Sequence, residues 1–185
     1  MSKERIILGI DPGTNVMGYG LIMEKGNRIE LITMGVLKLS GYDDHALKLK
    51  KIFERTLAII DEYHPDELSI EAPFHGKNVQ SMLKLGRAQG VAIAAALFRN
   101  IPVFEYSPKK IKLSVTGNGS SSKEQVAAML QTLLTYEQKP KLLDATDGLA
   151  AAVCHFLQRN DQKSGTSYTG WKAFISDNPD RVKKK

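Results

Sequence analysis

The sequence predicts an α/β fold in which helices cover both faces of a mixed five-stranded sheet. The first observation is that three strand-like segments open the chain and are joined by short turns, which is typical of antiparallel hairpins. The second is that strand-like and helical segments then alternate, and a strand–helix–strand connection places its two strands in parallel. Because the sheet combines both kinds of pairing and its strands are apolar, we expect helices on both of its faces.

The first three strands are short apolar runs bounded by turn residues. Residues 5–10 form an apolar run that ends at the Asp-Pro-Gly-Thr sequence of residues 11–14. Residues 18–23 and 29–39 flank a Glu-Lys-Gly-Asn sequence, and such a Gly-Asn step favours a hairpin turn. These strands are therefore expected to pair antiparallel in chain order.

Helical spacing of apolar residues defines the elements that follow. Between residues 46 and 63, apolar side chains such as Leu49, Ile52 and Ile60 recur every three or four positions, and Pro65 lies just beyond this helix. Pro108 suits the first turn of a later helix, and Gly117 suits its end. The remaining elements expected from these patterns are strands at 68–70 and 102–105, and helices at 79–99, 108–117, 123–134 and 142–157.

Length and composition indicate one domain with a tail. The 185 residues are 42% apolar and 25% charged, with charges of both signs, which argues against a wholly disordered chain. We expect one domain over residues 1–160, since domains of about 100–150 residues are the commonest. Residues 161–185 are rich in Gly, Ser, Asp and Lys and are expected to form a C-terminal tail, although three aromatic residues leave partial order open.

Charge and cysteine content bear on partners and on the compartment. The net charge of +6 and the pI of about 9.3 are compatible with a polyanionic partner. The single cysteine, Cys154, excludes an intrachain disulfide and fits a reducing compartment. The longest apolar run, residues 91–98, is far shorter than the ~20 residues that span a bilayer, and the first residues lack a signal-peptide core. We therefore expect a cytoplasmic protein with no membrane partner.

Four acidic residues stand where α/β proteins collect functional groups. Asp11 follows the first strand and Glu71 follows the strand at 68–70, and functional groups gather outside the carboxyl ends of strands. Asp144 and Asp147 lie three positions apart on a predicted helix, so they share one face. Each also has a purely structural interpretation, as a turn residue, a strand-end charge or a helix-start acid. Asp147 is the most informative, because it borders an apolar run, where carboxylates are rarely buried unless paired or bound to metal.

Gathered together, the four carboxylates would form a metal site. They would repel one another and raise each other's pKa values, whereas two divalent cations would cancel their charge. Hard oxygen ligands favour Mg²⁺ or Mn²⁺, and two such ions about 3.5–4 Å apart clamp the attacking and leaving oxygens in phosphodiester hydrolysis. The sequence has no cysteine pair and no histidine spacing that would build a different metal site.

Motifs around these acids carry a family resemblance. They read GIDPGT at residues 9–14, IEAPF followed by KN within residues 70–78, LKLGRAQG at residues 83–90 and DATDGLA at residues 144–150. In this order and spacing they resemble the RuvC family of Holliday junction resolvases, over about residues 5–158. The resemblance implies a ribonuclease H-like fold, a homodimer, and Mg²⁺-dependent cleavage of four-way DNA junctions by paired symmetric nicks in recombination and repair. It also implies partnership with a branch-migration helicase complex of the RuvA and RuvB type.

The resemblance assigns roles to individual residues. It implies that the four acids, Asp11, Glu71, Asp144 and Asp147, are the catalytic ligands of two Mg²⁺ ions per site, with Mn²⁺ as a substitute. Some family members have His at the third position, whereas this chain keeps Asp144. The residues that the resemblance assigns to DNA binding are Phe74, Lys77, Asn78, Lys112 and Lys123.

Alternatives remain for several of these residues. Phe74 could anchor its loop to the core rather than stack on a base, and the acid-free, lysine-rich stretch between Glu105 and Glu124 could be a solvated basic face. The Gly/Ser-rich residues 117–123 lack the spacing of a nucleotide-binding loop and are expected to form a flexible loop that carries Lys123 to DNA. The helix at 79–97 is rich in Gly and Ala, which suits either an internal position or, by the resemblance, a dimer interface.

Three other functions compete with junction cleavage. The first motif also resembles that of actin- and heat-shock-type ATPases, but such enzymes enclose the nucleotide between two lobes and this chain has residues for one. A noncatalytic binder of DNA junctions or RNA would not need the four acids. A ribonuclease H-like nuclease that acts on structured RNA is the nearest alternative.

Overall fold

The computed structural model describes residues 4–73, 78–134, 136 and 143–164, with side chains as far as Arg159. It confirms the mixed five-stranded sheet, whose strand order is β3-β2-β1-β4-β5. Strands β1, β2 and β3 pair antiparallel, whereas β4 pairs in parallel with both β1 and β5. The elements are β1 (Arg5–Asp11), β2 (Val16–Lys25), β3 (Arg28–Lys38), α1 (His45–Tyr63), β4 (Glu67–Glu71), α2 (Val79–Phe98), β5 (Val103–Tyr106), α3 (Pro108–Thr116), α4 (Lys123–Leu134) and α5 (Leu143–Ser164).

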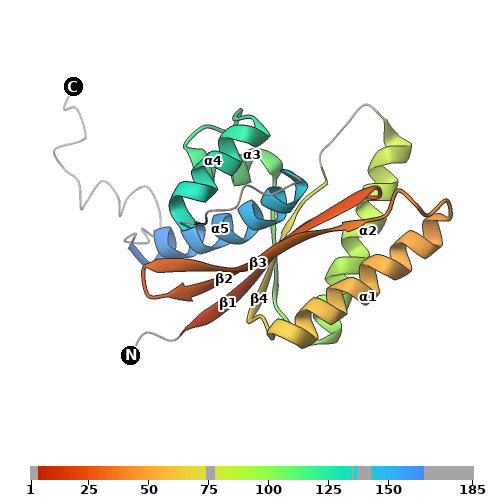
Figure 1. Ribbon diagram of the computed structural model, residues 1–185, viewed down its shortest axis with the longest axis horizontal. Helices are drawn as coiled ribbons and strands as arrows, with labels where there is room; N and C mark the ends of the chain where they lie inside the picture. The colour runs from red at the N-terminus through yellow and green to blue at the C-terminus, as the bar shows by residue number, and fades with distance from the viewer. Residues whose placement is uncertain (1–3, 74–77, 135, 137–142, 165–185) are drawn as a thin grey trace, which may run out of the picture.

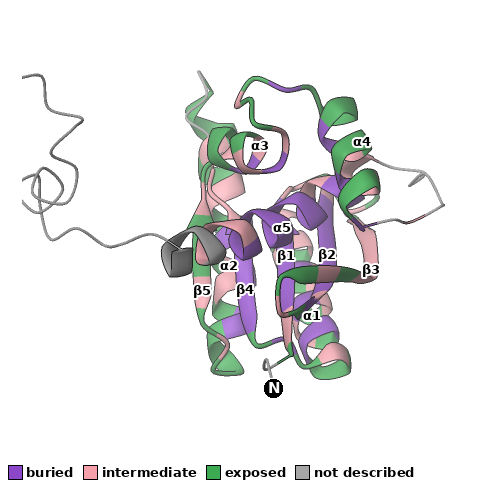
Figure 2. Cartoon of the chain, turned by 90° about the vertical axis from the view of Figure 1, so that its left-hand side faces the viewer, coloured by how far each residue is buried: buried purple, intermediate pink, exposed green. Residues whose placement is uncertain are grey.

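Helices cover both faces of the sheet. Helices α3, α4 and α5 lie on one face, and α1 and α2 lie side by side on the other (Figure 1). Strands β1, β2 and β4 and helix α5 are largely buried, whereas α3 and α4 present exposed outer surfaces (Figure 2). No helix in the described part of the chain is both long enough and apolar enough to cross a lipid bilayer.

The alternation of side chains along β1 divides the core into two clusters. Ile7 packs in the cluster formed with α3, α4 and α5, whereas Leu8 and Ile10 pack in the cluster formed with α1 and α2. Successive side chains of a strand point to opposite faces, so Asp11 shares the α5 side of the sheet with Ile7. In β4 the hydroxyl of Ser69 donates a hydrogen bond of 2.7 Å to the carbonyl of Ala151 in α5, which places Glu71 on the same side.

Helix α5 packs unusually close to the sheet because glycines face it. A Cβ atom at Gly9 would lie 2.1 Å from the carbonyl oxygen of Gly148, and one at Gly18 would lie 1.8 Å from that of Asp144. Only a residue without a side chain fits either position. The glycines therefore determine how deeply the start of α5 sits against β1 and β2.

Helix α5 extends beyond its expected end at residue 157. It continues to Ser164, because the polar residues after Leu157 still form helical turns and Arg159 pairs with Glu24 and Glu67. The helix thus includes the first four residues of the expected tail at 161–185. Residues 165–185 lie outside the described part of the chain, so the division into a domain and a tail stays a prediction.

Candidate active site

The ends of two neighbouring strands bring Asp11 and Glu71 together. Strands β1 and β4 run in parallel, and Ile10 pairs with Ile70 immediately before the two acids. Each acid is the last residue of its strand, and both point to the α5 side of the sheet. The expectation that these two strands lie side by side is confirmed.

The register between α5 and β4 adds the acids of the helix. Four residues of a helix rise about 6 Å, and two residues of a strand rise about 6.6 Å, so a helix can match a strand four residues for two. Ala151 meets Ser69, and four residues further on His155 meets Glu67. Four residues before Ala151 in the helix, and two residues after Ser69 in the strand, the same register places Asp147 opposite Glu71. Asp144 precedes Asp147 by one turn, at the start of α5.

Three of the four acids line one cavity of about 520 Å³ at the carboxyl edge of the sheet, whereas Asp144 is not part of its lining. Its acidic wall consists of Asp11, Glu71 and Asp147, and its basic wall comes from α3 and α4. Lysine side chains therefore face carboxylates across a space open to a substrate. The lysines of the basic wall are Lys109, Lys112 and Lys123.

Burial and mutual repulsion raise the pKa values of the acids. The pKa of Asp11 is raised well above its ordinary value, chiefly by burial and then by the charges of Glu71 and Asp147. Burial and the charge of Asp147 raise the pKa of Glu71 to about 7, although Lys123 and Lys112 lower it in part. Burial also raises the pKa of Asp147, against the opposing effect of its hydrogen bond with Lys123. The site thus destabilises its own negative charges.

Lys123 lies between two of the carboxylates. Its ammonium nitrogen is 3.2 Å from Oδ1 of Asp144 and 2.5 Å from Oδ2 of Asp147. Burial opposes the charge of Lys123, but the two hydrogen bonds raise its pKa above the ordinary value. The family resemblance assigned Lys123 to DNA, whereas here its ammonium group is shared between two carboxylates and offsets one of their two charges.

The donor set fits a hard divalent cation. The four candidate ligands are all carboxylates, which are the ligands that Mg²⁺ and Mn²⁺ prefer. Within the described residues, no three metal-binding side chains stand close enough to hold an ion as they are placed. The ammonium group of Lys123 pairs with two of these carboxylates, Asp144 and Asp147.

The residues assigned to DNA differ in where they lie. Lys112 lines the cavity beside Lys123, as expected for a phosphate contact. Asn78 caps the start of α2, where its side chain accepts a hydrogen bond of 3.1 Å from the backbone of Ser81. Phe74 and Lys77 lie outside the described residues. Lys109 also lines the cavity although the sequence assigned it no role; its only signal was its place in the lysine-rich stretch.

The loop that leads to Lys123 is internally hydrogen-bonded, in contrast to the flexible loop that its Gly/Ser content predicted. Gly117 ends α3 with a φ of 76°, a left-handed conformation that suits glycine. The hydroxyls of Thr116 and Ser121 are hydrogen-bonded at 2.8 Å, and Asn118 accepts a bond of 3.0 Å from the backbone of Ser120. The loop therefore delivers Lys123 to the cavity from a defined turn.

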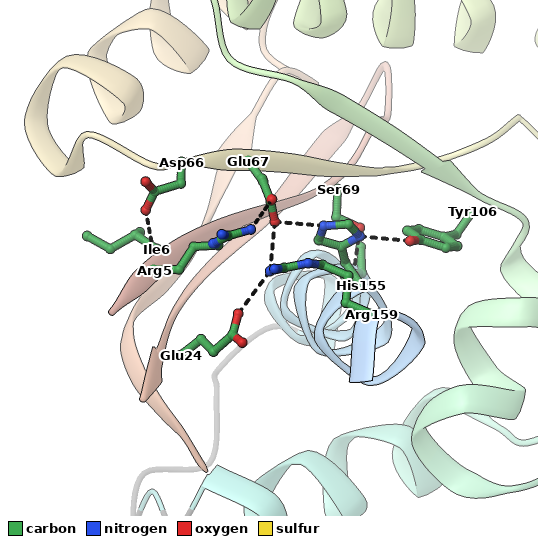
Figure 3. Close-up of polar contacts among 10 residues, drawn as sticks. Arg5, Ile6, Glu24, Asp66, Glu67, Ser69, Tyr106, His155 and Arg159 are labelled. Carbon is green, nitrogen blue, oxygen red and sulfur yellow. Dashed lines mark hydrogen bonds and ion pairs between the residues drawn. The ribbon is translucent and has the colours of Figure 1, made fainter. Parts of the chain in front are cut away.

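A polar network at the far end of α5 holds the helix against the sheet (Figure 3). We call the side chains of Arg5, Glu24, Glu67, His155 and Arg159 the α5 anchor network. Glu67 bonds Arg5 at 2.5 Å, His155 at 2.9 Å and Arg159 at 3.1 Å, and Arg159 also bonds Glu24 at 2.9 Å. Burial raises the pKa of Glu67, but these partners outweigh it and hold the pKa below its ordinary value. The partners are up to 135 positions apart in the chain, so no local sequence signal indicated the network.

Replacing Glu67 is expected to destabilise the protein. Glu67→Ala leaves Arg5, His155 and Arg159 without their shared partner, and breaking a buried ion pair in this way costs about 3 kcal/mol. Urea unfolding at pH 7 measures the change. Glu54→Ala is the matched control, because Glu54 pairs with Lys50 and Lys51 on the exposed side of α1 and such pairs contribute less than about 1 kcal/mol. Equal losses in the two variants would contradict the role of the network.

Known proteins are similar to this chain in both sequence and fold. The family model of the crossover junction endodeoxyribonuclease RuvC matches residues 7–155. The relative from Cytophaga hutchinsonii is 66% identical over 180 residues, covering 97% of this chain and 89% of the relative, and that from Bacteroides fragilis is 62% identical over 183 residues, covering 98% and 97%. Both relatives are named as crossover junction endodeoxyribonucleases.

Solved structures with a similar fold include junction resolvases. The structure of Thermus thermophilus RuvC in complex with a Holliday junction substrate superposes with a TM-score of 0.79 at 28% identity, covering 85% of this chain and 96% of that one. The yeast mitochondrial Holliday junction resolvase Ydc2 has a TM-score of 0.62 at 13% identity, covers 85% and 81%, and supports the fold alone. The ribonuclease H-like fold expected from the motifs is thus confirmed, and the chain belongs to the RuvC family of crossover junction endodeoxyribonucleases.

Proposed function

We propose that this protein is a metal-dependent endonuclease that resolves four-way DNA junctions by paired symmetric nicks during recombination and repair. The observation that carries the proposal is the cavity in which acids from β1, β4 and α5 face lysines from α3 and α4. Acids that hold cations and lysines that hold phosphates are what phosphodiester hydrolysis requires. The junction-bound relative from Thermus thermophilus supports four-way DNA as the substrate.

The four acids would hold two Mg²⁺ ions, with Mn²⁺ as a substitute. When bound, two such ions activate the attacking water and stabilise the leaving oxygen. If Asp144 and Asp147 held a cation, Lys123 would lose both of its partners, and its ammonium group would be available to a phosphate oxygen. Lys112 and Lys109 then hold neighbouring phosphates at the rim of the cavity. Phe74, Lys77 and Asn78 are proposed to contact the DNA beside the cut.

Comparing two substrates tests the proposal. The full chain is incubated with Mg²⁺ and either a four-way DNA junction or a folded RNA of equal length. We expect symmetric nicks in the junction and little cleavage of the RNA. Preferential RNA cleavage would instead favour a ribonuclease that acts on structured RNA, and no cleavage of either with Mg²⁺ or Mn²⁺ would favour a noncatalytic binder.

Stability of the metal-free protein is expected to fall as the pH rises. The pKa of Glu71 is about 7 in the folded state against an ordinary value of 4.5, so folding favours the protonated acid. Its stabilising contribution is complete below pH 4.5 and is lost as the pH rises through about 7, a change on the order of 3 kcal/mol. Thermal unfolding between pH 4.5 and pH 8 measures it, and Mg²⁺ should reverse the loss at pH 8. Glu71→Gln should reduce this dependence without abolishing it, because the pKa values of Asp11 and Asp147 are also raised; a variant that follows the wild-type curve would contradict the contribution of Glu71.

Homodimer formation is proposed to use helix α2. The exposed fractions of Val79, Leu83 and Leu97 are 64%, 52% and 57%, and helical spacing aligns these residues along one stripe. Gly86 and Gly90 share this stripe, and open space surrounds both. An apolar stripe with small residues allows two helices to approach closely. A two-fold dimer would place two identical cavities on a junction with two symmetric strands. The branch-migration helicase complex is proposed as the partner of this dimer.

A charge on this stripe should separate the protomers. Leu83→Glu places an unpaired carboxylate in the proposed interface, so we expect a monomer in sedimentation velocity and loss of paired nicks. Leu133→Glu is the matched control, since Leu133 is similarly exposed at 42% but lies on α4. A Leu83→Glu protein that stays dimeric would show that another surface forms the dimer.

A further inference from the structure

The carboxyl edge of the sheet has a second polar cavity, on the opposite face from the acids. It encloses about 340 Å³ between the loop after β1, the start of α1 and the start of α2. The lining residues that matter here are Thr14, Asn15, His45, Lys48, Ser81 and Lys84.

Topology places this cavity close to the catalytic one. Strands β1, β3 and β4 run in the same direction, so the chain leaves all three at one edge of the sheet. The loop after β1 begins at Asp11, and Thr14 lies three residues further on. Three residues span at most about 11 Å. The two cavities therefore flank the same short loop, one on each side of the sheet edge.

Several polar groups in the cavity have no partner. Among the described residues, neither the Lys48 nor the Lys84 ammonium group has an ion pair or a hydrogen bond, in contrast to Lys50 and Lys51, which both pair with Glu54. Nε2 of His45 is buried and has no hydrogen-bond partner. Buried polar atoms nearly always have a partner, so an unpaired one next to a polar cavity points to a ligand.

The charges of the cavity select an anion. Two lysines face one acid, Asp43, and the hydroxyls of Thr14 and Ser81 can donate hydrogen bonds to an oxyanion. The starts of α1 and α2 adjoin the cavity but are already capped by Asp44 and Asn78, so the anion would depend on the lysines and hydroxyls. A phosphodiester is an oxyanion that this set of donors can hold in a space of this size.

We propose that this cavity is a second phosphate-binding site, which holds the backbone of the DNA strand a few nucleotides from the phosphate cut at Asp11. The inference rests on the proposed function. The chain path from Asp11 to Thr14 is at most about 11 Å, so the second phosphate would lie within a few nucleotides of the cut. Lys48 and Lys84 bind the phosphate without touching the reacting atoms, so the site contributes to affinity and to the path of the strand, not to the chemical step.

Salt dependence of junction binding tests the proposal. Dissociation constants of the full chain for a four-way junction are measured in Ca²⁺ over a range of salt concentrations. Lys48→Gln/Lys84→Gln should weaken binding about tenfold and lower the salt slope by about 1 to 2, since each phosphate contact contributes about 0.9. The kcat for Mg²⁺-dependent cleavage at saturating junction should stay within about twofold. Lys50→Gln/Lys51→Gln removes the same total charge, in this case from α1 alone, at residues that pair with Glu54, and it should change neither quantity.

Cross-linking locates the strand. Ser81→Cys introduces a thiol at the cavity, and the native Cys154 is fully buried and does not compete. Junctions with a thiol tether on one phosphate should cross-link within a few nucleotides of the cut and not elsewhere.

Each remaining outcome separates the hypotheses. An equal loss of junction affinity in Lys48→Gln/Lys84→Gln and Lys50→Gln/Lys51→Gln, or no cross-link beside the cut, would overturn the inference. Junction cleavage by the wild type would still uphold the proposed function. The wild type could bind inorganic phosphate through Lys48 and Lys84 while Lys48→Gln/Lys84→Gln leaves the affinity for the junction unchanged. That result would overturn the assignment of the cavity to DNA. A wild-type protein that neither binds nor cuts the junction overturns the proposed function and this inference with it.

Discussion

Asp11→Asn is expected to lower junction cleavage by at least about a thousandfold while binding in Ca²⁺ persists. Asp11 is deeply buried and is repelled by the charges of Glu71 and Asp147, and its replacement removes the proposed metal ligand at the end of β1. Losses of this size are typical when one member of a catalytic group that acts as a unit is removed. Single-turnover cleavage with Mg²⁺ and a binding titration with Ca²⁺ measure the two effects separately.

The same variant should be more stable than the wild type in the absence of metal at pH 8. Burial and two neighbouring carboxylates oppose the ionised form of Asp11, and asparagine has the same shape without the charge. Each kcal/mol gained raises Tm by about 2–4 °C in a protein of this size. Asp61→Asn is the matched control, because Asp61 is exposed and pairs with Arg99, far from the cavity; it should cleave normally. Full activity of Asp11→Asn would refute the assignment of the active site.

Gly18→Ala is expected to reduce both stability and activity. A Cβ atom at this position would lie 1.8 Å from the carbonyl oxygen of Asp144 and 2.8 Å from its carbonyl carbon. Backbone atoms cannot rotate away as a side chain can, so the start of α5 must move off the sheet. Overpacking of this kind costs about 3 kcal/mol or more. The displaced helix carries Asp144 and Asp147, so we also expect cleavage to fall about a hundredfold.

Urea unfolding and single-turnover cleavage measure the two effects of Gly18→Ala. Gly41→Ala is the control, because nothing lies within 4 Å of a Cβ atom there and its φ is not in the left-handed region. It should change stability by less than about 0.5 kcal/mol. A Gly18→Ala protein with wild-type stability and cleavage would mean that α5 packs less closely than the glycines indicate.

Local patterns were sufficient to predict the elements and the four candidate acids. The apolar run of β1 and the turn after it placed Asp11 at a strand end, and the short run of β4 did the same for Glu71. Helical spacing, together with the turn residues Pro108 and Gly117, predicted the five helices of the described residues, because these signals lie within a few residues of each other. The end of α5 was placed too early, since its last turns have no apolar stripe and are held by Arg159 through distant acids.

The site as a whole depends on contacts between distant parts of the chain. The α5 anchor network joins residues from β1, β2, β4 and α5. Lys109 reaches the cavity only because α3 packs beside α5. The pairing of Lys123 with Asp144 and Asp147 bridges 21 and 24 positions. None of these follows from periodicity or from a motif, since each depends on the angle and depth at which a helix packs.

The sequence by itself determined which elements form, which family the motifs resemble and which four acids are candidates for catalysis, because these properties reside in short stretches of chain. Only the tertiary structure decided that α5 meets β4 in the register that places Asp147 opposite Glu71, and that Lys123 pairs with both Asp144 and Asp147. It also decided where a second cavity with unpaired lysines lies. The physical reason is that packing depth and helix register are set by glycines and ion pairs that meet only when the sheet and α5 come together.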